Sequence, residues 1–244
     1  TEAEYFDFVR AGAADEESFD QEYMCVPSDD DSKFIEYELI TGCEYQAGVQ
    51  WERGVADRFS GRLFCGVDIG RKKDLTVLWV VEQLGDVLYT RAVVPLERKR
   101  KSDQEAILYP WFDICDRICI DATGLGIGWA DDAQDKFGGH RVEAVTFTGQ
   151  VKEALAYPLK GRMEDRAVRI PDDPVIHADL RKVKKVTTAA GNIRFEAEST
   201  PDGHADRFWA LALAIHAASN PSAPIEFMSD GVARGADAEG FIHG

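Results

Sequence analysis

The sequence predicts an α/β fold built on one mixed sheet, because strand-like segments come first and helix-like segments follow. Three apolar, strand-like segments lie at residues 62–68, 75–81 and 86–95. The last clear element, 207–218, is apolar nearly all round, as expected of a buried helix. The 244 residues, 45% of them hydrophobic, are enough for one large domain with a buried core.

The first three strands are expected to form an antiparallel meander. Residues 62–68 form a near-continuous apolar run, which is typical of a strand buried on both faces. A short polar link at 71–74 and a turn at 84–86 separate the three segments. Strands joined by such tight links pair with their sequence neighbours.

The elements that follow complete a mixed sheet. Ser102 and Glu105 predict a capping box at the start of a helix at 102–115, which Pro110 interrupts. The remaining expected elements are strands at 117–120 and 141–147, helices at 126–137, 151–163, 175–186 and 207–218, and a hairpin formed by 185–189 and 192–197. This order is that of a ribonuclease H-like mixed sheet (order 3-2-1-4-5) with flanking helices and an extra β-hairpin.

Three aspartates stand where this topology could bring them together. Asp68 and Asp121 end the first and fourth strands, and Asp206 opens the last helix. The first and fourth strands would be parallel neighbours about 4.8 Å apart, and sites in such sheets form at the carboxyl ends of the strands. Converging carboxylates repel one another unless cations lie between them. The sequence therefore predicts that Asp68, as the bridging ligand, Asp121 and Asp206 hold two Mg²⁺ ions for phosphodiester hydrolysis.

Other residues near these positions could assist, although each has an ordinary structural alternative. Asp74 is a candidate fourth ligand or a turn residue, and His204 is a candidate auxiliary group or a hydrogen-bonded turn histidine. The basic side chains that could contact the DNA backbone, or simply lie solvated on the surface, are Arg71, Lys72, Lys73, Lys152, Lys182, Lys184 and Lys185.

Composition limits the class of protein. The formal net charge is −16, but residues 1–60 carry 16 acidic and 4 basic residues, and residues 160–194 carry 9 basic and 5 acidic ones. The acidity is therefore concentrated at the front of the chain and does not exclude a nucleic-acid partner. The five cysteines are odd in number and form no Cys-x-x-Cys pair, so we expect neither a zinc site nor a disulfide framework. The sequence shows neither a signal peptide nor an apolar run of roughly 18 residues, so it does not predict membrane association.

Several strings in the sequence resemble a known family. They are Gly66-Val67-Asp68-Ile69-Gly70, Cys119-Ile120-Asp121-Ala122-Thr123-Gly124, and Gly203-His204-Ala205-Asp206-Arg207-Phe208-Trp209. Over about residues 60–218 the chain is similar to the nuclease domain of phage terminase large subunits, with the nearest likeness to the group from Mu-like phages and prophages. The resemblance implies a metal-dependent endonuclease that uses two Mg²⁺ or Mn²⁺ ions to cut concatemeric viral double-stranded DNA during packaging, with Asp68, Asp121 and Asp206 as catalytic acids.

The resemblance also implies a division of the chain. The full subunit of that family has an ATPase, but this chain contains no Gly-x-x-x-x-Gly-Lys-[Ser/Thr] phosphate loop. We expect 1–60 to be a linker or remnant of the preceding ATPase domain, 61–218 the nuclease domain, and 219–244 a flexible tail. The implied partners of the full-length protein are the portal and the small terminase subunit, in the host cytoplasm. The isolated domain is expected to be monomeric.

Three rival interpretations remain open at this stage. A junction resolvase or transposase of the same superfamily would use the same carboxylates on another DNA substrate. An actin-like kinase would explain Asp68 and the Asp121–Gly124 string, but that fold needs two such halves and gives Asp206 no role. A docking module with an inactive site is the non-enzymatic alternative.

Overall fold

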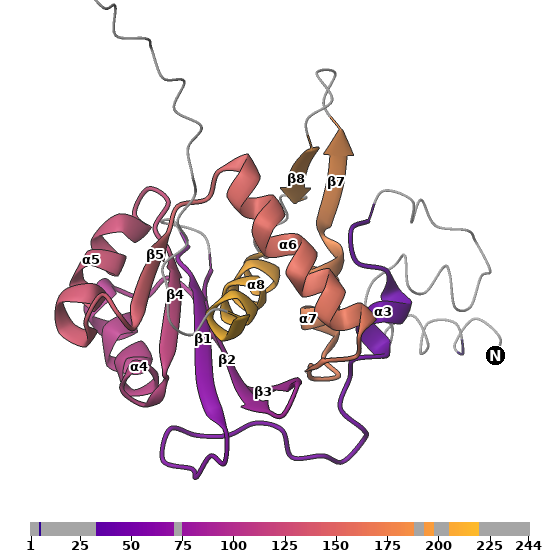
Figure 1. The fold of residues 1–244 in the computed structure, drawn as a ribbon, viewed down its shortest axis with the longest axis horizontal. Helices are drawn as coiled ribbons and strands as arrows, with labels where there is room; N and C mark the ends of the chain where they lie inside the picture. The colour runs from indigo at the N-terminus through magenta and orange to yellow at the C-terminus, as the bar shows by residue number, and fades with distance from the viewer. Residues whose placement is uncertain (1–4, 6–32, 71–74, 188–192, 198–204, 220–244) are drawn as a thin grey trace, which may run out of the picture.

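A six-stranded mixed sheet lies at the centre of the molecule, with helices on both faces (Figure 1). The computed structural model describes residues 5, 33–70, 75–187, 193–197 and 205–219. The strand order is β5-β4-β1-β2-β3-β6. The bounds are β1 Arg62–Asp68, β2 Thr76–Leu84, β3 Val87–Leu96, β4 Arg117–Asp121, β5 Val142–Val145 and β6 Val168–Arg169.

The strand pairing confirms the predicted order 3-2-1-4-5 and adds one strand. β1, β2 and β3 are antiparallel neighbours, whereas β4 is parallel to both β1 and β5. The short β6, which was not predicted as a strand, pairs with β3 in parallel and extends that edge. In the β1–β4 register Val67 lies opposite Ile120, so Asp68 and Asp121 occupy the next position on each strand.

Two groups of helices sandwich the sheet. In Figure 1, α4 and α5 lie on one side of the sheet, and α6, α7 and α8 lie on the other. Side chains of β1 alternate between the two resulting cores: Cys65 and Val67 join the α4–α5 core, and Phe64 joins the α6–α8 core. The helix bounds are α3 Tyr37–Thr41, α4 Lys101–Ile114, α5 Gly126–Phe137, α6 Gly149–Glu164, α7 Pro174–Arg181 and α8 Asp206–Ser219.

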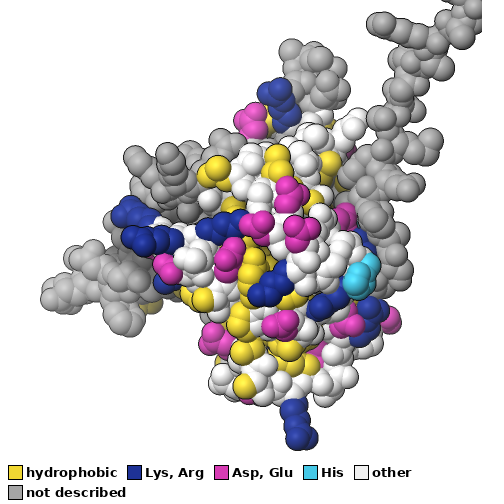
Figure 2. All heavy atoms as spheres, turned by 90° about the vertical axis from the view of Figure 1, so that its left-hand side faces the viewer, with side chains coloured by type: hydrophobic (Ala, Val, Ile, Leu, Met, Phe, Trp, Pro, Cys, Tyr) yellow, Lys and Arg dark blue, Asp and Glu magenta, His cyan; other side chains and the backbone are white. Residues whose placement is uncertain are grey.

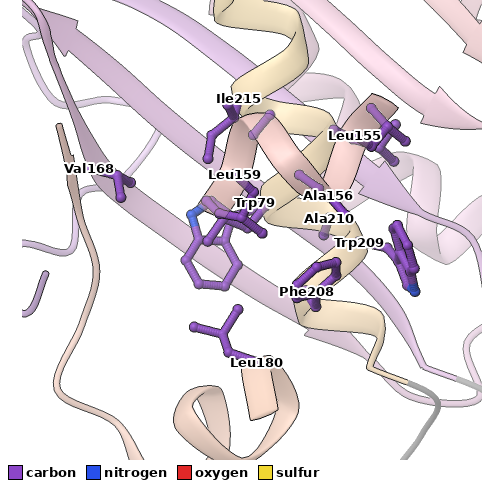
Figure 3. Close-up of a cluster of buried hydrophobic side chains, with 14 of the residues drawn as sticks. Trp79, Leu155, Ala156, Leu159, Val168, Leu180, Phe208, Trp209, Ala210 and Ile215 are labelled. Atoms are coloured by element: carbon purple, nitrogen blue, oxygen red, sulfur yellow. The ribbon is translucent and has the colours of Figure 1, made fainter. Parts of the chain in front are cut away.

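Helix α8 is the centre of the α6–α8 core. All but three of its residues are buried, which confirms the prediction from its apolar composition. Figure 3 shows Phe208 and Ala210 of α8 in one cluster with Trp79 of β2 and Leu155 of α6. The helix approaches β1 so closely that a Cβ at Gly66 would collide with the Ala210 carbonyl oxygen and lie 2.6 Å from Leu213 Cβ.

Two local predictions were wrong. Helix α4 begins at Lys101 with Arg100 as its N-cap and no side-chain cap hydrogen bond, so Ser102 lies inside the first turn and forms no capping box. The helix expected at 175–186 ends at Arg181. Residues 183–187 instead form β7, which pairs with β8 (193–197). A hairpin forms as predicted, but its first strand begins at Val183 rather than at the expected Lys185. Pairing with β8 and burial of Val183 outweigh the local helical pattern there.

Part of the segment expected to be a linker packs against the domain. The core residues of this stretch are Phe34, Ile35, Ile40 and Cys43. Backbone bridges join Lys33 to Lys184 and Glu44 to Ile170. Residues 33–44 therefore contribute to the folded body, while the boundary at residue 60 stays a prediction. Among the described residues, no helix combines the length and apolar character that a membrane span requires.

The packing of α8 on β1 can be tested with glycine substitutions. We expect Gly66→Ala to lower the free energy of unfolding by about 2–3 kcal/mol, because the added methyl group must displace the α8 backbone. Gly161→Ala in α6 is the matched control: a Cβ there meets nothing within 4 Å, so it should raise stability by about 0.5–1 kcal/mol. Urea denaturation of both variants measures the difference. Equal stability of the two variants would contradict the close approach.

Candidate metal centre

Two of the three predicted aspartates lie side by side at the carboxyl end of the sheet. Asp68 ends β1 and Asp121 ends β4, and both are 7% exposed. The backbone N–H of Thr123 donates to Asp121 Oδ1 at 2.8 Å, while the Thr123 hydroxyl accepts from the Phe147 N–H at 2.9 Å. These bonds orient the Asp121 carboxylate and tie its loop to the segment that follows β5.

The third aspartate lies at the same edge of the sheet because α8 runs antiparallel to β4. Near the end of α8, His216 Nε2 lies 3.4 Å from Glu143 Oε1, and Glu143 also forms an ion pair with Arg117, the first residue of β4. The beginning of α8 therefore lies toward the end of β4. Asp206, its first residue, is 5% exposed. The topology thus brings all three predicted carboxylates to the end of the sheet at which β1 and β4 finish.

A buried ion-pair group holds the start of α8. Asp179 of α7 is 1% exposed and accepts from Arg207 Nη1 at 2.9 Å and from Lys182 Nζ at 2.7 Å. It also accepts from the Arg207 backbone N–H at 3.4 Å, a favourable place for an anion at a helix N-terminus. Ala205, which directly precedes the first residue of α8, is buried and has a φ of 64°. This left-handed conformation costs a non-glycine residue about 1–2 kcal/mol. Strain of this kind is found where surrounding contacts fix a functional residue.

Lys152 of α6 is the cation whose charge acts on the two strand-end carboxylates. Its ammonium lies 4.9 Å from the centroid of the Trp209 ring. Burial lowers the pKa of Lys152 from its ordinary value, while Asp68 and Asp121 act to raise it. The sequence marked this lysine as a DNA contact, and the structure places its charge within electrostatic range of Asp68 and Asp121.

The donor set suits hard divalent cations, which prefer carboxylate oxygens. Within the described part of the chain, two groups of three possible ligand atoms lie wholly within 4.8 Å of one another, and neither is the aspartate trio. The described structure therefore does not bring the three carboxylates within the span of one such compact group.

The remaining candidate residues divide into three cases. Lys182 is held by Asp179, so its ammonium is engaged in the support of α8. Lys184 and Lys185 lie on β7, and Lys185 Nζ lies 5.6 Å from the centroid of the Tyr157 ring. The candidates outside the described residues are Asp74, His204, Arg71, Lys72 and Lys73.

Sequence reasoning missed two supporting groups, Asp179 with Arg207 and Arg117 with Glu143. Arg117 forms a buried ion pair with Glu143, which links β4 to β5. A charged residue inside an apolar strand, such as Arg117, was the available signal. Cys65 and Cys119 are buried as expected of small hydrophobes, and the described cysteines are free thiols. Burial raises the pKa of the Cys119 thiol, so this residue stays protonated.

Comparison with known proteins identifies a family. Residues 65–218 match the family model of the terminase RNaseH-like domain. No curated protein matches the chain.

Solved structures support the fold. The large terminase nuclease from thermophilic phage G20c with bound magnesium is 23% identical with a TM-score of 0.61, and the match covers 78% of this chain and 98% of that one. The Thermus phage P74-26 large terminase nuclease domain is 22% identical with a TM-score of 0.57, covering 74% and 94%. The nuclease domain of the large terminase subunit of bacterial virus Sf6, solved with manganese and β-thujaplicinol, is 12% identical with a TM-score of 0.54, covering 75% and 98%.

The support of α8 by Asp179 can be tested by removing its charge. Asp179→Asn leaves Arg207 and Lys182 without their shared carboxylate, so we expect the free energy of unfolding to fall by about 3 kcal/mol. Asp173→Asn is the matched control in the same helix, because Asp173 is the N-cap of α7 and asparagine caps equally well. Thermal unfolding of the two variants compares them, and an equal loss would show that Asp179 supports nothing beyond its own helix.

Proposed function

The chain belongs to the family of terminase RNaseH-like domains, and on this basis we propose that it is the nuclease that cuts concatemeric viral double-stranded DNA during genome packaging. The observation that carries the proposal is the adjacency of Asp68 and Asp121 at the ends of two parallel strands, with Asp206 at the start of the helix laid over them. The similar nucleases of phage G20c and virus Sf6 were solved with magnesium and with manganese, which supports a divalent metal cofactor for this site.

The proposed chemistry is hydrolysis of a phosphodiester bond with two Mg²⁺ or Mn²⁺ ions. Bound there, such ions would activate the attacking water and stabilise the leaving oxygen. Asp68 lies on β1, between β4 and β2 in the sheet, and is proposed as the shared ligand, with Asp121 and Asp206 each on one side. Thr123 keeps the Asp121 carboxylate in place through its backbone N–H, and Asp179 holds the helix that presents Asp206.

Besides the metal ions, the Lys152 side chain supplies a positive charge near the carboxylates. It offsets part of the repulsion between Asp68 and Asp121, and its ammonium is kept in place by the faces of Trp209 and Phe147. A DNA phosphate that reaches the carboxylates would meet this ammonium, which favours binding of the negatively charged backbone. We propose Lys152 as a substrate-positioning residue of the site.

DNA is proposed to approach the carboxyl edge of the sheet. The face covered by α4 and α5 carries acidic and basic side chains next to one another (Figure 2), and the two helices hold six acidic and two basic residues, so they do not favour DNA binding there. The β7–β8 hairpin projects from the other side of the sheet (Figure 1). Its Lys184 and Lys185, together with Arg71, Lys72, Lys73 and His204, remain proposed DNA-facing groups, and Asp74 remains a proposed outer ligand.

The setting of this nuclease is also a proposal. The domain would act as part of a full-length large terminase subunit, with the portal and the small terminase subunit as partners, in the host cytoplasm. A single site cuts one strand at a time, because the strands of a duplex run in opposite directions. A clean double-strand break then requires two copies. A junction resolvase would share the fold and the carboxylates, and differs in cutting four-way junctions.

Metal-dependent cutting is the first test of this function. We expect the chain to nick and cut plasmid DNA in magnesium or manganese, to stop in excess EDTA, and to prefer linear duplex over four-way junctions. Asp68→Asn should reduce the rate at least about 100-fold, since even residues that only support a metal ligand contribute 10–100-fold. Gel analysis of the products measures each rate, and undiminished cutting by the variant would defeat the assignment.

Substitution of Lys152 should separate function from stability. The lowered pKa of Lys152 means that its charged form is disfavoured in the folded protein relative to the unfolded chain. Lys152→Met removes that unfavourable charge, so we expect an unchanged or higher Tm at pH 7, together with a cutting rate lower by about 10–100-fold. Lys136→Met, on exposed α5, is the control and should leave cutting intact. A Lys152 variant that cuts normally would remove this residue from the site.

A further inference from the structure

A second group of potential metal ligands lies at the opposite edge of the sheet from β5. The ligand atoms of Glu44, Asp172 and His177 all lie within 4.8 Å of one another. Glu44 pairs with Ile170, next to the edge strand β6. β1, β2, β3 and β6 are successive neighbours in the sheet, so three strand spacings, or roughly 14 Å, separate β6 from β1. The register places β6 level with Arg62 at the start of β1, whereas Asp68 ends that strand, so the group is well separated from Asp68.

The spacing of the first two ligand atoms fits one metal ion. His177 Nε2 lies 3.2 Å from Glu44 Oε1. Nitrogen and oxygen ligands of a tetrahedral zinc ion, each about 2.0–2.1 Å from the metal, are about 3.3 Å apart. The imidazole is fixed in place, because His177 is 3% exposed and the Tyr37 ring contacts it edge-on with the centroids 6.3 Å apart.

The charges of the group call for a cation. The ligand oxygens of Glu44 and Asp172 lie within 4.8 Å of each other and of the His177 imidazole, and a bound dication would offset the repulsion between the two carboxylates. Asp172 is exposed, Glu44 is partly buried and His177 is buried. An ion can therefore reach the group from solvent on the side of Asp172.

We propose that Glu44, Asp172 and His177 bind a transition-metal dication of the zinc type, separate from the catalytic carboxylates. One imidazole nitrogen and two carboxylate oxygens are a donor set that zinc accepts. The ion fastens the segment that follows α3 to β6 and α7; α3 and α7 lie side by side in Figure 1, and Glu44 pairs with Ile170 beside β6. The other compact group of possible ligands consists of Cys119, Glu143 and His216. Its Glu143 is already paired with the positive charge of Arg117, which disfavours a metal cation there.

The test uses the whole chain carrying Asp68→Asn and Asp121→Asn, so that zinc binding by the catalytic carboxylates is suppressed. Zinc affinity is measured by competition with a chromophoric chelator, and Tm is measured with and without zinc. We expect one zinc per chain and a Tm that rises with zinc concentration. Adding Asp172→Asn should weaken zinc binding at least about tenfold and reduce the Tm rise, and His177→Gln should do the same.

Two controls keep the outcome decisive. Asp131→Asn makes the same charge change on exposed α5 and should leave zinc affinity unchanged. Because Asp172 is exposed, its substitution tests the site even if the buried His177→Gln variant fails to fold. Absence of zinc binding, or equal affinity in the Asp172→Asn and Asp131→Asn variants, would overturn the proposal. Neither result bears on DNA cutting, which is measured separately in the chain with its aspartates intact.

Discussion

The close approach of α8 to β1 is the constraint on which the rest of the structure depends. A helix that passes over a strand at the distance allowed by Gly66 leaves no room for it to slide or turn without a collision. Its direction, opposite to β4, brings Asp206 toward the edge where Asp68 and Asp121 end. A site made of two adjacent strand ends and one helix start therefore has its geometry set by backbone packing, and side-chain contacts then refine it.

The charges around the site follow from that packing. Three buried carboxylates near one another would repel, and the charge of Lys152 on α6 offsets part of this cost for Asp68 and Asp121. Arg207, which follows Asp206 on α8, pairs with Asp179 of α7. Burying Lys152 lowers its pKa, so its charge is held there at some expense to folding. The charged form of Lys152 is disfavoured by burial, yet its charge interacts with two carboxylates. Such a residue is better explained by function than by stability.

The sequence was sufficient for those features that depend on local pattern. The both-face burial of 62–68, the meander, and the aspartates at strand ends could be predicted because apolar runs and their end points are visible along the chain. The edge strand β6 and the partnership of Asp179 with Arg207 depend on residues far apart in sequence. No local pattern distinguishes Lys152, which reaches two carboxylates, from the other lysines of the chain, because its neighbours come from α8 and from β1 and β4.

The segment ahead of the family match also takes part in the packing around the third aspartate. The Phe34 ring lies 4.8 Å from that of Phe195 and 6.3 Å from that of Phe208, measured between centroids. Phe208 follows Asp206 by two residues, at the start of the helix whose position sets the site. Because a close-packed core transmits displacement, a shift of this segment would act on the same turn of α8 that Asp179 holds. Phe34 of this segment thus packs against the first turn of α8, two residues beyond Asp206.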